Sequence, residues 1–223
     1  NRARHAAAWL LAAAMASPAA AGAAGADEDD TDPDPTRLSH EVQALVEPGT
    51  RLFKARVADL NLDGRPDLVY ILHRLPPTPE GDELEERQRP LRIALRGADG
   101  RLRVVATNET LVQCHTCGGI WPEPFDELSA GPGEFTVGHY GGSRWRWSDR
   151  WRFVYDPQAR TWFLDRVQLG QDVEEGGHQV STYVRGRHFG HHRIDRFERE
   201  NFHTQHLRKG VPPLATVRDD SRS

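Results

Sequence analysis

Cysteine, methionine and lysine are scarce in this chain of 223 residues. It has 2 cysteines and 1 methionine, and only Lys54 and Lys209 among its 29 basic residues are lysine. Two cysteines cannot complete a four-cysteine zinc site within one chain, so that class of metal protein is excluded. The preference for arginine carries no functional information, and the formal net charge of -4 argues against nucleic acid as a partner.

Long apolar runs are also missing. The longest, Ala6 to Ala16, falls short of the roughly 20 residues that span a bilayer. Arginines precede this run, Pro18 interrupts it and Ala-Gly-Ala sequences follow it. The pattern predicts a secretory signal over residues 1–26, and a periplasmic or secreted mature chain without a transmembrane segment. The alternative is an alanine-rich helix at the start of a cytosolic domain.

The familiar catalytic motifs are absent as well. The chain contains no G-x-S-x-G, no H-E-x-x-H and no glycine loop that leads into a helix and cradles phosphate. Acidic pairs such as Asp82-Glu83 lie in a charged, proline-containing loop and carry little weight as acid–base candidates. Whether the protein is an enzyme is left uncertain, with a non-catalytic role favoured.

What the chain does have is a series of short, strand-like runs separated by turn residues. An acidic tail over residues 27–35 is expected to be disordered, and Thr36 can cap a short helix that ends near Glu47. Strands are predicted at 52–58, 68–72, 91–95, 102–106, 134–140, 143–155 and 161–169. Asp99-Gly100 favours a hairpin between the third and fourth of these. The result is a mainly β domain of antiparallel sheets over residues 36–170, followed by a polar, histidine- and arginine-rich segment over 171–223 that docks in part.

The most specific local pattern covers residues 59–67. Its oxygen ligands for a cation would come from Asp59, Asn61, Asp63, Asp67 and the backbone carbonyl of Arg65. This is the ligand order of an EF-hand loop as far as position 9, with Gly64 at the sharp turn. Tyr70 stands where an EF-hand has Glu, and both flanks are strand-like. The sequence therefore predicts a structural calcium site between strands; the alternative is an Asx-rich turn without metal.

Residues 57–69 resemble the calcium loop of the FG-GAP or VCBS repeat of integrin-like β-propeller blades. Residues 91–95 and the Asp-Gly turn at 99–100 resemble the later strand and turn of that repeat, so the resemblance covers about residues 52–106. It implies that Asp59, Asn61, Asp63 and Asp67 bind calcium. Leu62 stands where the family usually has Gly. One clear repeat is present, whereas a propeller needs at least four blades, so a full propeller is not expected.

Cys114 and Cys117 have the spacing of a redox motif, but Gly118, Gly119 and Pro122 oppose the helix that such a motif needs. A local disulfide in an oxidising compartment is the main prediction, with a metal or redox role as the alternative.

Six histidines fall in the C-terminal segment, and two pairings among them have metal-ligand spacing: His188 with His191 or His192, and His203 with His206. The arginines around them favour a solvated tail instead.

Aromatic and arginine residues alternate from Ser143 to Tyr155. If this stretch is one strand, its aromatic face is predicted to be core. The alternative is a ligand strip of exposed indoles formed by Trp145, Trp147 and Trp151.

These patterns favour an exported, calcium-stabilised β protein that acts as a non-catalytic binding or structural module at the cell envelope. Its partner would be an envelope protein or polysaccharide. The alternative function is an envelope hydrolase or redox protein that uses His139, Cys114, Cys117 or the C-terminal histidines.

Overall fold

The computed structural model of the chain describes residues 40–75, 89–174, 176–202 and 206–219. The expected signal at 1–26, the acidic tail at 27–35, the acidic loop with Asp82-Glu83 and His203 lie outside the described residues.

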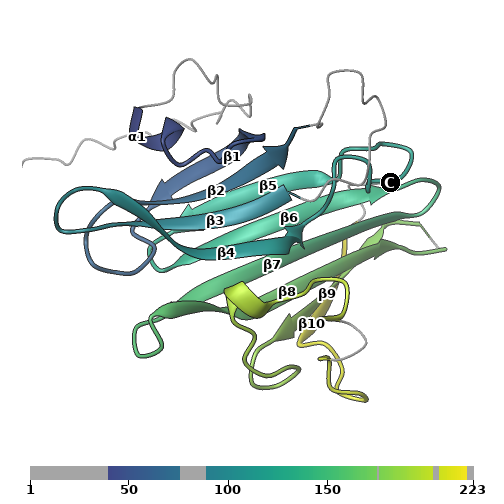
Figure 1. The fold of residues 1–223 in the computed structure, drawn as a ribbon. Helices are drawn as coiled ribbons and strands as arrows, with labels where there is room; N and C mark the ends of the chain where they lie inside the picture. Colours follow the sequence, from purple (N-terminus) through teal and green to yellow (C-terminus); the bar gives the residue numbers. More distant parts are fainter. Residues whose placement is uncertain (1–39, 76–88, 175, 203–205, 220–223) are drawn as a thin grey trace, which may run out of the picture. The chain divides into compact units, whose positions relative to one another are not determined.

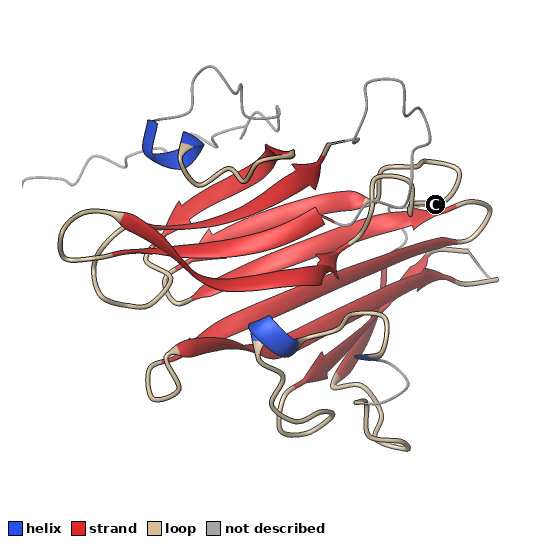
Figure 2. Ribbon diagram, in the orientation of Figure 1, coloured by secondary structure: helices blue, strands red, loops and turns tan. Residues whose placement is uncertain are grey.

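Within this part of the chain, ten strands form two antiparallel sheets, and Figures 1 and 2 show them as two layers. The smaller sheet has the order β1-β2-β3-β4, and its strands are Thr50–Ala58, Asp67–Arg74, Arg89–Arg96 and Leu102–Val112. The larger sheet has the order β10-β9-β8-β7-β6-β5. Its strands, in chain order, are Phe125–Gly131, Glu134–Gly142, Arg146–Asp156, Thr161–Asp172, His178–Val184 and Ala215–Asp219.

The main core lies between the two sheets, because alternate side chains of each sheet point toward the other. Val69, Ile71 and Ile93 of the smaller sheet belong to the same buried cluster as Val137 and Trp151 of the larger one. Burial of side chains of this size stabilises the fold by about 1.5–3 kcal/mol each before conformational entropy is subtracted. This packing fixes which face of each strand is available for a site.

A second, smaller cluster covers the other face of the first sheet. Leu52, Tyr70 and Leu72 point to this face and are packed by Val42 and Leu45, which lie in and just after the short helix α1, His40–Gln43. Strand β2 is therefore buried on both faces over its first six residues.

The C-terminal segment crosses the larger sheet after β9. The 3-10 turn η2, Ile194–Arg196, is held to β4 because the Asn108 side-chain amide donates to the carbonyls of Ile194 and Phe197, at 2.6 and 2.8 Å. Phe197 and Phe202 each place a ring 5.3 Å from that of Trp151. This anchoring sets the position of the residues between them, including Arg199.

The prediction of a mainly β fold with antiparallel sheets is confirmed, and the described strands close into neither a barrel nor a propeller. The hairpin around Asp99-Gly100 is confirmed as the β3–β4 connection. The helix expected to end near Glu47 ends at Gln43, since α1 covers His40–Gln43 in the described part of the chain. In the described residues, no helix has both the length and the apolar character needed to cross a membrane.

Candidate functional site

The loop between β1 and β2 gathers its polar side chains by local hydrogen bonds. The two carboxylate oxygens of Asp59 accept the backbone N–H groups of Asp63 and Gly64, at 2.9 and 2.8 Å. Asn61 accepts from the N–H of Asp63 at 3.2 Å, and Asp63 accepts from that of Arg65 at 3.0 Å. Leu62 has a φ of 63°, a left-handed conformation that favours glycine. Leu62 therefore holds a strained backbone conformation at the tip of the loop.

Asp67 is oriented differently from the other acidic residues of the loop. It is buried at the start of β2, and its two oxygens accept the N–H groups of Leu60 and Arg96, at 3.0 and 2.8 Å. Burial raises the pKa of Asp67, and the nearby carboxylates of Asp63 and Asp59 add to this effect. Leu60 is fully buried, and its carbonyl accepts the indole N–H of Trp162 at 3.0 Å. The loop is thus fastened to both sheets.

The donor set of the loop fits a calcium ion in part. Asp59, Asn61 and Asp63 provide hard oxygen donors of the kind that calcium requires within a single turn, and these oxygens accept backbone N–H groups of the same turn. One oxygen of Asp63 is paired with the guanidinium of Arg65 at 2.5 Å, and Asp67 is committed to backbone N–H groups. No group of three or more His, Cys, Asp or Glu in the described ranges is arranged to hold a metal.

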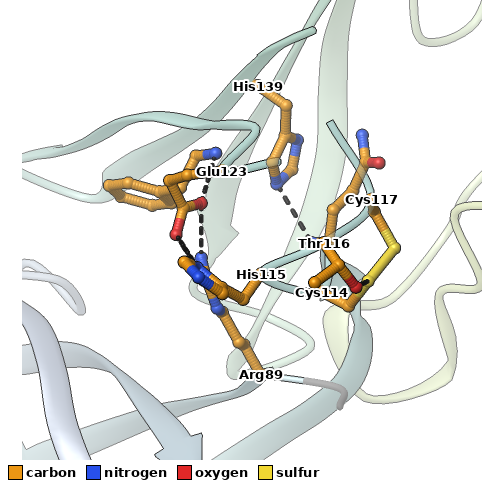
Figure 3. Close-up of a disulfide and its surroundings, with 9 residues drawn as sticks. Arg89, Cys114, His115, Thr116, Cys117, Glu123 and His139 are labelled. Atoms are coloured by element: carbon orange, nitrogen blue, oxygen red, sulfur yellow. Dashed lines mark hydrogen bonds and ion pairs between the residues drawn. A yellow bond between two sulfur atoms is a disulfide. The ribbon is translucent and has the colours of Figure 1, made fainter. Parts of the chain in front are cut away.

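The two cysteines form a disulfide, Cys114–Cys117, with Cα atoms 5.2 Å apart (Figure 3). Cys114 is buried and Cys117 is exposed. The predicted local disulfide is confirmed. It lies in the connection between β4 and β5 and lines a cavity of about 140 Å³ together with Gln113 and Arg199.

Beside the disulfide, Figure 3 shows Arg89 and His115 converging on Glu123. The Arg89 guanidinium makes two contacts with this carboxylate, at 2.7 and 2.5 Å, and His115 Nδ1 lies 2.9 Å from it. Burial raises the pKa of Glu123, but these hydrogen bonds outweigh it and leave the pKa below its ordinary value. Arg89 also lies over the ring of Phe53, 4.3 Å from its centre. This cluster ties β3 to the disulfide loop.

His139 is completely buried and both of its ring nitrogens are in hydrogen bonds. Nδ1 lies 2.5 Å from Asp149, and Nε2 accepts the backbone N–H of Gln113 at 3.2 Å. The ring therefore joins β6 to β7 and to the residue before the disulfide. It has no surface on which to meet a ligand.

The C-terminal histidines are also used in protein contacts. His188 is buried, with Nδ1 accepting the N–H of Val184 at 2.9 Å and Nε2 lying 2.8 Å from the carbonyl of Pro212. The rings of His192 and His206 have centroids 4.3 Å apart, and that of His191 packs edge-on against Phe163.

A groove of about 430 Å³ lies on the inner face of β7, β8 and β9. Two cross-strand rows form its floor: Trp147, Gln171 and Gln179 in one, and Asp149, Leu169 and Ser181 in the next. Tyr183, Arg199, and Ser148 and Gly170 of the interior strands complete the lining. Because these strands are interior to the sheet, their backbone groups are paired, and the hydrogen-bonding capacity of the groove comes from side chains.

Arg199 reaches the groove from the C-terminal segment and lies 3.3 Å from Asp149. Within the described part of the chain, its Nε is buried and has no acceptor. The groove is thus lined by a carboxylate and a guanidinium that contact each other, and by two side-chain amides and a hydroxyl beside aromatic rings.

The three tryptophans of the expected ligand strip occupy different environments. Trp151 is completely buried in the core, Trp145 is 51% exposed before β7 begins, and half-buried Trp147 lines the groove. The indole of Trp147 lies over Gly141 of β6, where a Cβ atom would come within 2.7 Å of it. Gly141 is therefore needed for this packing.

Sequence reasoning singled out Trp147 but missed Gln171, Gln179, Ser181 and Arg199. The alternation of Val167, Leu169 and Gln171 carried the signal for Gln171, whereas the partners from β9 and the C-terminal segment depend on tertiary packing. Comparisons with protein families, curated proteins and solved structures found no match.

Proposed function

We propose that this chain is an exported binding protein that holds a saccharide segment of the cell envelope in the groove of β7–β9. The observation that carries the proposal is the row of Trp147, Gln171 and Gln179 on the groove floor. An indole offers a flat apolar surface to the C–H face of a sugar ring, and side-chain amides both donate to and accept from hydroxyl groups. The volume of the groove lies within the range of ligand sites.

The chemistry favours a saccharide over a peptide. An extended peptide is usually recognised by unpaired backbone groups at a sheet edge, and β7, β8 and β9 are interior strands. Asp149 and Arg199 contribute one charge of each sign, which suits a ligand rich in neutral hydroxyl groups.

Two further features support export and a structural ion. Disulfides such as Cys114–Cys117 are typical of oxidising compartments. The secretory signal predicted at 1–26 would direct the chain to such a compartment. The ligand order of Asp59, Asn61 and Asp63 supports calcium, which would replace the Arg65 guanidinium at Asp63 and stabilise the loop.

Retention on immobilised envelope polysaccharide tests the binding function. We expect Trp147→Ala to lower affinity by about tenfold or more, because a buried aromatic anchor dominates such contacts. Trp145→Ala, which removes an exposed indole outside the groove, is the matched control and should bind like the wild type. Equal retention of the two variants would refute the assignment of the groove.

A further inference from the structure

A second set of polar side chains lies on the opposite face of the same three strands. Ser148 Oγ of β7 is 2.9 Å from Nε2 of His178, the first residue of β9. His178 Nδ1 is 2.9 Å from the carboxylate of Asp172, the last residue of β8. Ser148 contributes to the lining of the groove, but side chains alternate along a strand, so its hydroxyl points to the face opposite the side chains of Trp147 and Asp149.

This arrangement depends on the register and on one glycine. Gly170 of β8 pairs with Ser148 on one side, and Asp172 pairs with His178 on the other. A Cβ atom at Gly170 would lie 2.2 Å from Ser148 Oγ and 2.3 Å from His178 Nε2. Only glycine leaves room for the hydroxyl and the imidazole to meet across the strand between them.

The hydrogen bonds also fix where the protons lie. Asp172 accepts the backbone N–H of Arg146 with its second oxygen, at 2.7 Å. Burial raises the pKa of Asp172, but the hydrogen bonds from His178 and Arg146 outweigh it and lower the pKa. An ionised carboxylate only accepts, so His178 Nδ1 carries the proton and donates it. When the imidazole is neutral, His178 Nε2 carries no proton and can accept that of Ser148.

We propose that Ser148, His178 and Asp172 form a hydrolytic site for esters with a short acyl group. The three side chains stand in the order nucleophile, base and orienting carboxylate, which defines such a site by geometry rather than by sequence motif. His178 is 1% exposed and Ser148 is 7% exposed. The small exposed area at Ser148 limits the acyl group to a small one such as acetyl.

The reaction proceeds in two halves. Ser148 Oγ forms a bond to the carbonyl carbon as its proton passes to His178 Nε2, and that proton then leaves with the alcohol as the ester C–O bond breaks. Water then attacks the carbonyl carbon of the acyl-serine as one of its protons passes to His178 Nε2. The bond between Ser148 Oγ and the acyl carbon breaks, the acid leaves, and the proton on His178 passes to Ser148 Oγ. Asp172 holds the imidazolium in place. Tyr140, the pair partner of Ser148, and Arg146 also lie on this face of the sheet.

This activity is independent of the binding proposed for the groove, because the two sites use opposite faces of the sheet. The same set could serve the fold alone by joining three strands. A structural role predicts an unreactive Ser148, whereas a hydrolytic role predicts a hydroxyl that reacts with electrophiles.

The purified full chain should be treated with a fluorophosphonate–rhodamine probe and assayed with 4-nitrophenyl acetate. We expect labelling at Ser148, and the loss of labelling and turnover in Ser148→Ala. Asp172→Asn and His178→Gln should slow turnover by about 10²- to 10⁴-fold. Ser129→Ala, which removes an exposed hydroxyl on β5, should behave like the wild type.

Circular dichroism of each variant keeps loss of folding apart from loss of chemistry, and Ser148→Ala removes a single oxygen atom. A folded wild-type chain that is unlabelled, that is labelled at another residue, or whose turnover survives in Ser148→Ala would overturn the proposal. Trp147→Ala should leave acetate hydrolysis intact while it weakens polysaccharide retention, so either proposal can fail without the other.

Discussion

His73 shows how the surroundings of a single residue create a pH dependence. It lies on β2, and its Nδ1 is buried without a hydrogen-bond partner among the described residues. Burial, together with the charges of Arg89 and Arg51, lowers the pKa of His73 to about 4, from an ordinary value of 6.5. The folded chain therefore keeps this ring neutral where an unfolded chain would protonate it.

Because the folded pKa is depressed, stability from His73 is fully present above pH 6.5 and is lost as the pH falls toward about 4. We expect His73→Gln to reduce the fall in unfolding free energy over this window by about 1–2 kcal/mol, less than the full shift because the side chain is partly solvated. Denaturant titrations at several pH values measure the unfolding free energy of each variant over this window. His40→Gln, at an exposed position, is the control, and parallel curves for wild type and His73→Gln would contradict the assignment.

Residue patterns could predict some of the candidate sites and not others. The Asp59–Asp67 loop is contiguous, so its ligand order could be identified in the sequence. Ser148 and His178 lie 30 positions apart in the sequence and meet only through the registers of β7, β8 and β9. No local motif encodes that meeting, and motif searches for a nucleophile consequently found none.

At the scale of elements, alternation predicted seven of the strands, and β4 proved longer than expected because its second half also pairs with β3. Strands β5, β9 and β10 were missed. β5 begins directly after Pro122 and Pro124, which favour irregular backbone, and β9 carries polar residues on both faces. Such strands are formed by pairing with neighbours rather than by their own pattern.

The loop between β1 and β2 carries the prediction about calcium. At about 1 mM calcium, a dissociation constant of roughly 10⁻⁴ M would stabilise the fold by about 1.4 kcal/mol and raise the melting temperature by roughly 3–6 °C. We expect a chelator to remove this increment from the wild type, and Asp63→Ala to abolish the response to calcium. Calorimetry with and without chelator measures both effects.

Asp156→Ala is the matched control for this loop, because Asp156 also caps an exposed turn by accepting backbone N–H groups, from Gln158 and Ala159. It should keep the full response to calcium. An unchanged melting temperature of the wild type on chelation would show that the loop is an Asx-rich turn without metal.

At the scale of the whole molecule, the unequal sheets account for the position of the groove. Six strands face four, and the apolar rows of Val137 and Trp151 give way to polar rows toward β9. The C-terminal segment, anchored through Phe197 and Phe202, brings Arg199 to the remaining inner face. The sequence could indicate the aromatic strand β7. The polar floor of the groove also needs β9 and the C-terminal segment with Arg199, which lie beside β7 and β8 only through tertiary packing.

The central claim is that a saccharide binds on the inner face of β7–β9. A nuclear magnetic resonance titration tests it directly, because it observes the side-chain N–H signals of the groove residues. Soluble fragments of envelope polysaccharide are added to the ¹⁵N-labelled protein, with Trp147→Phe and Gln171→Glu used to assign side-chain signals. The account predicts saturable shifts of the Trp147 indole N–H and of the Gln171 and Gln179 amides, with the Trp145 indole unmoved. Saturable shifts confined to residues outside the groove, or none at millimolar saccharide, would contradict it.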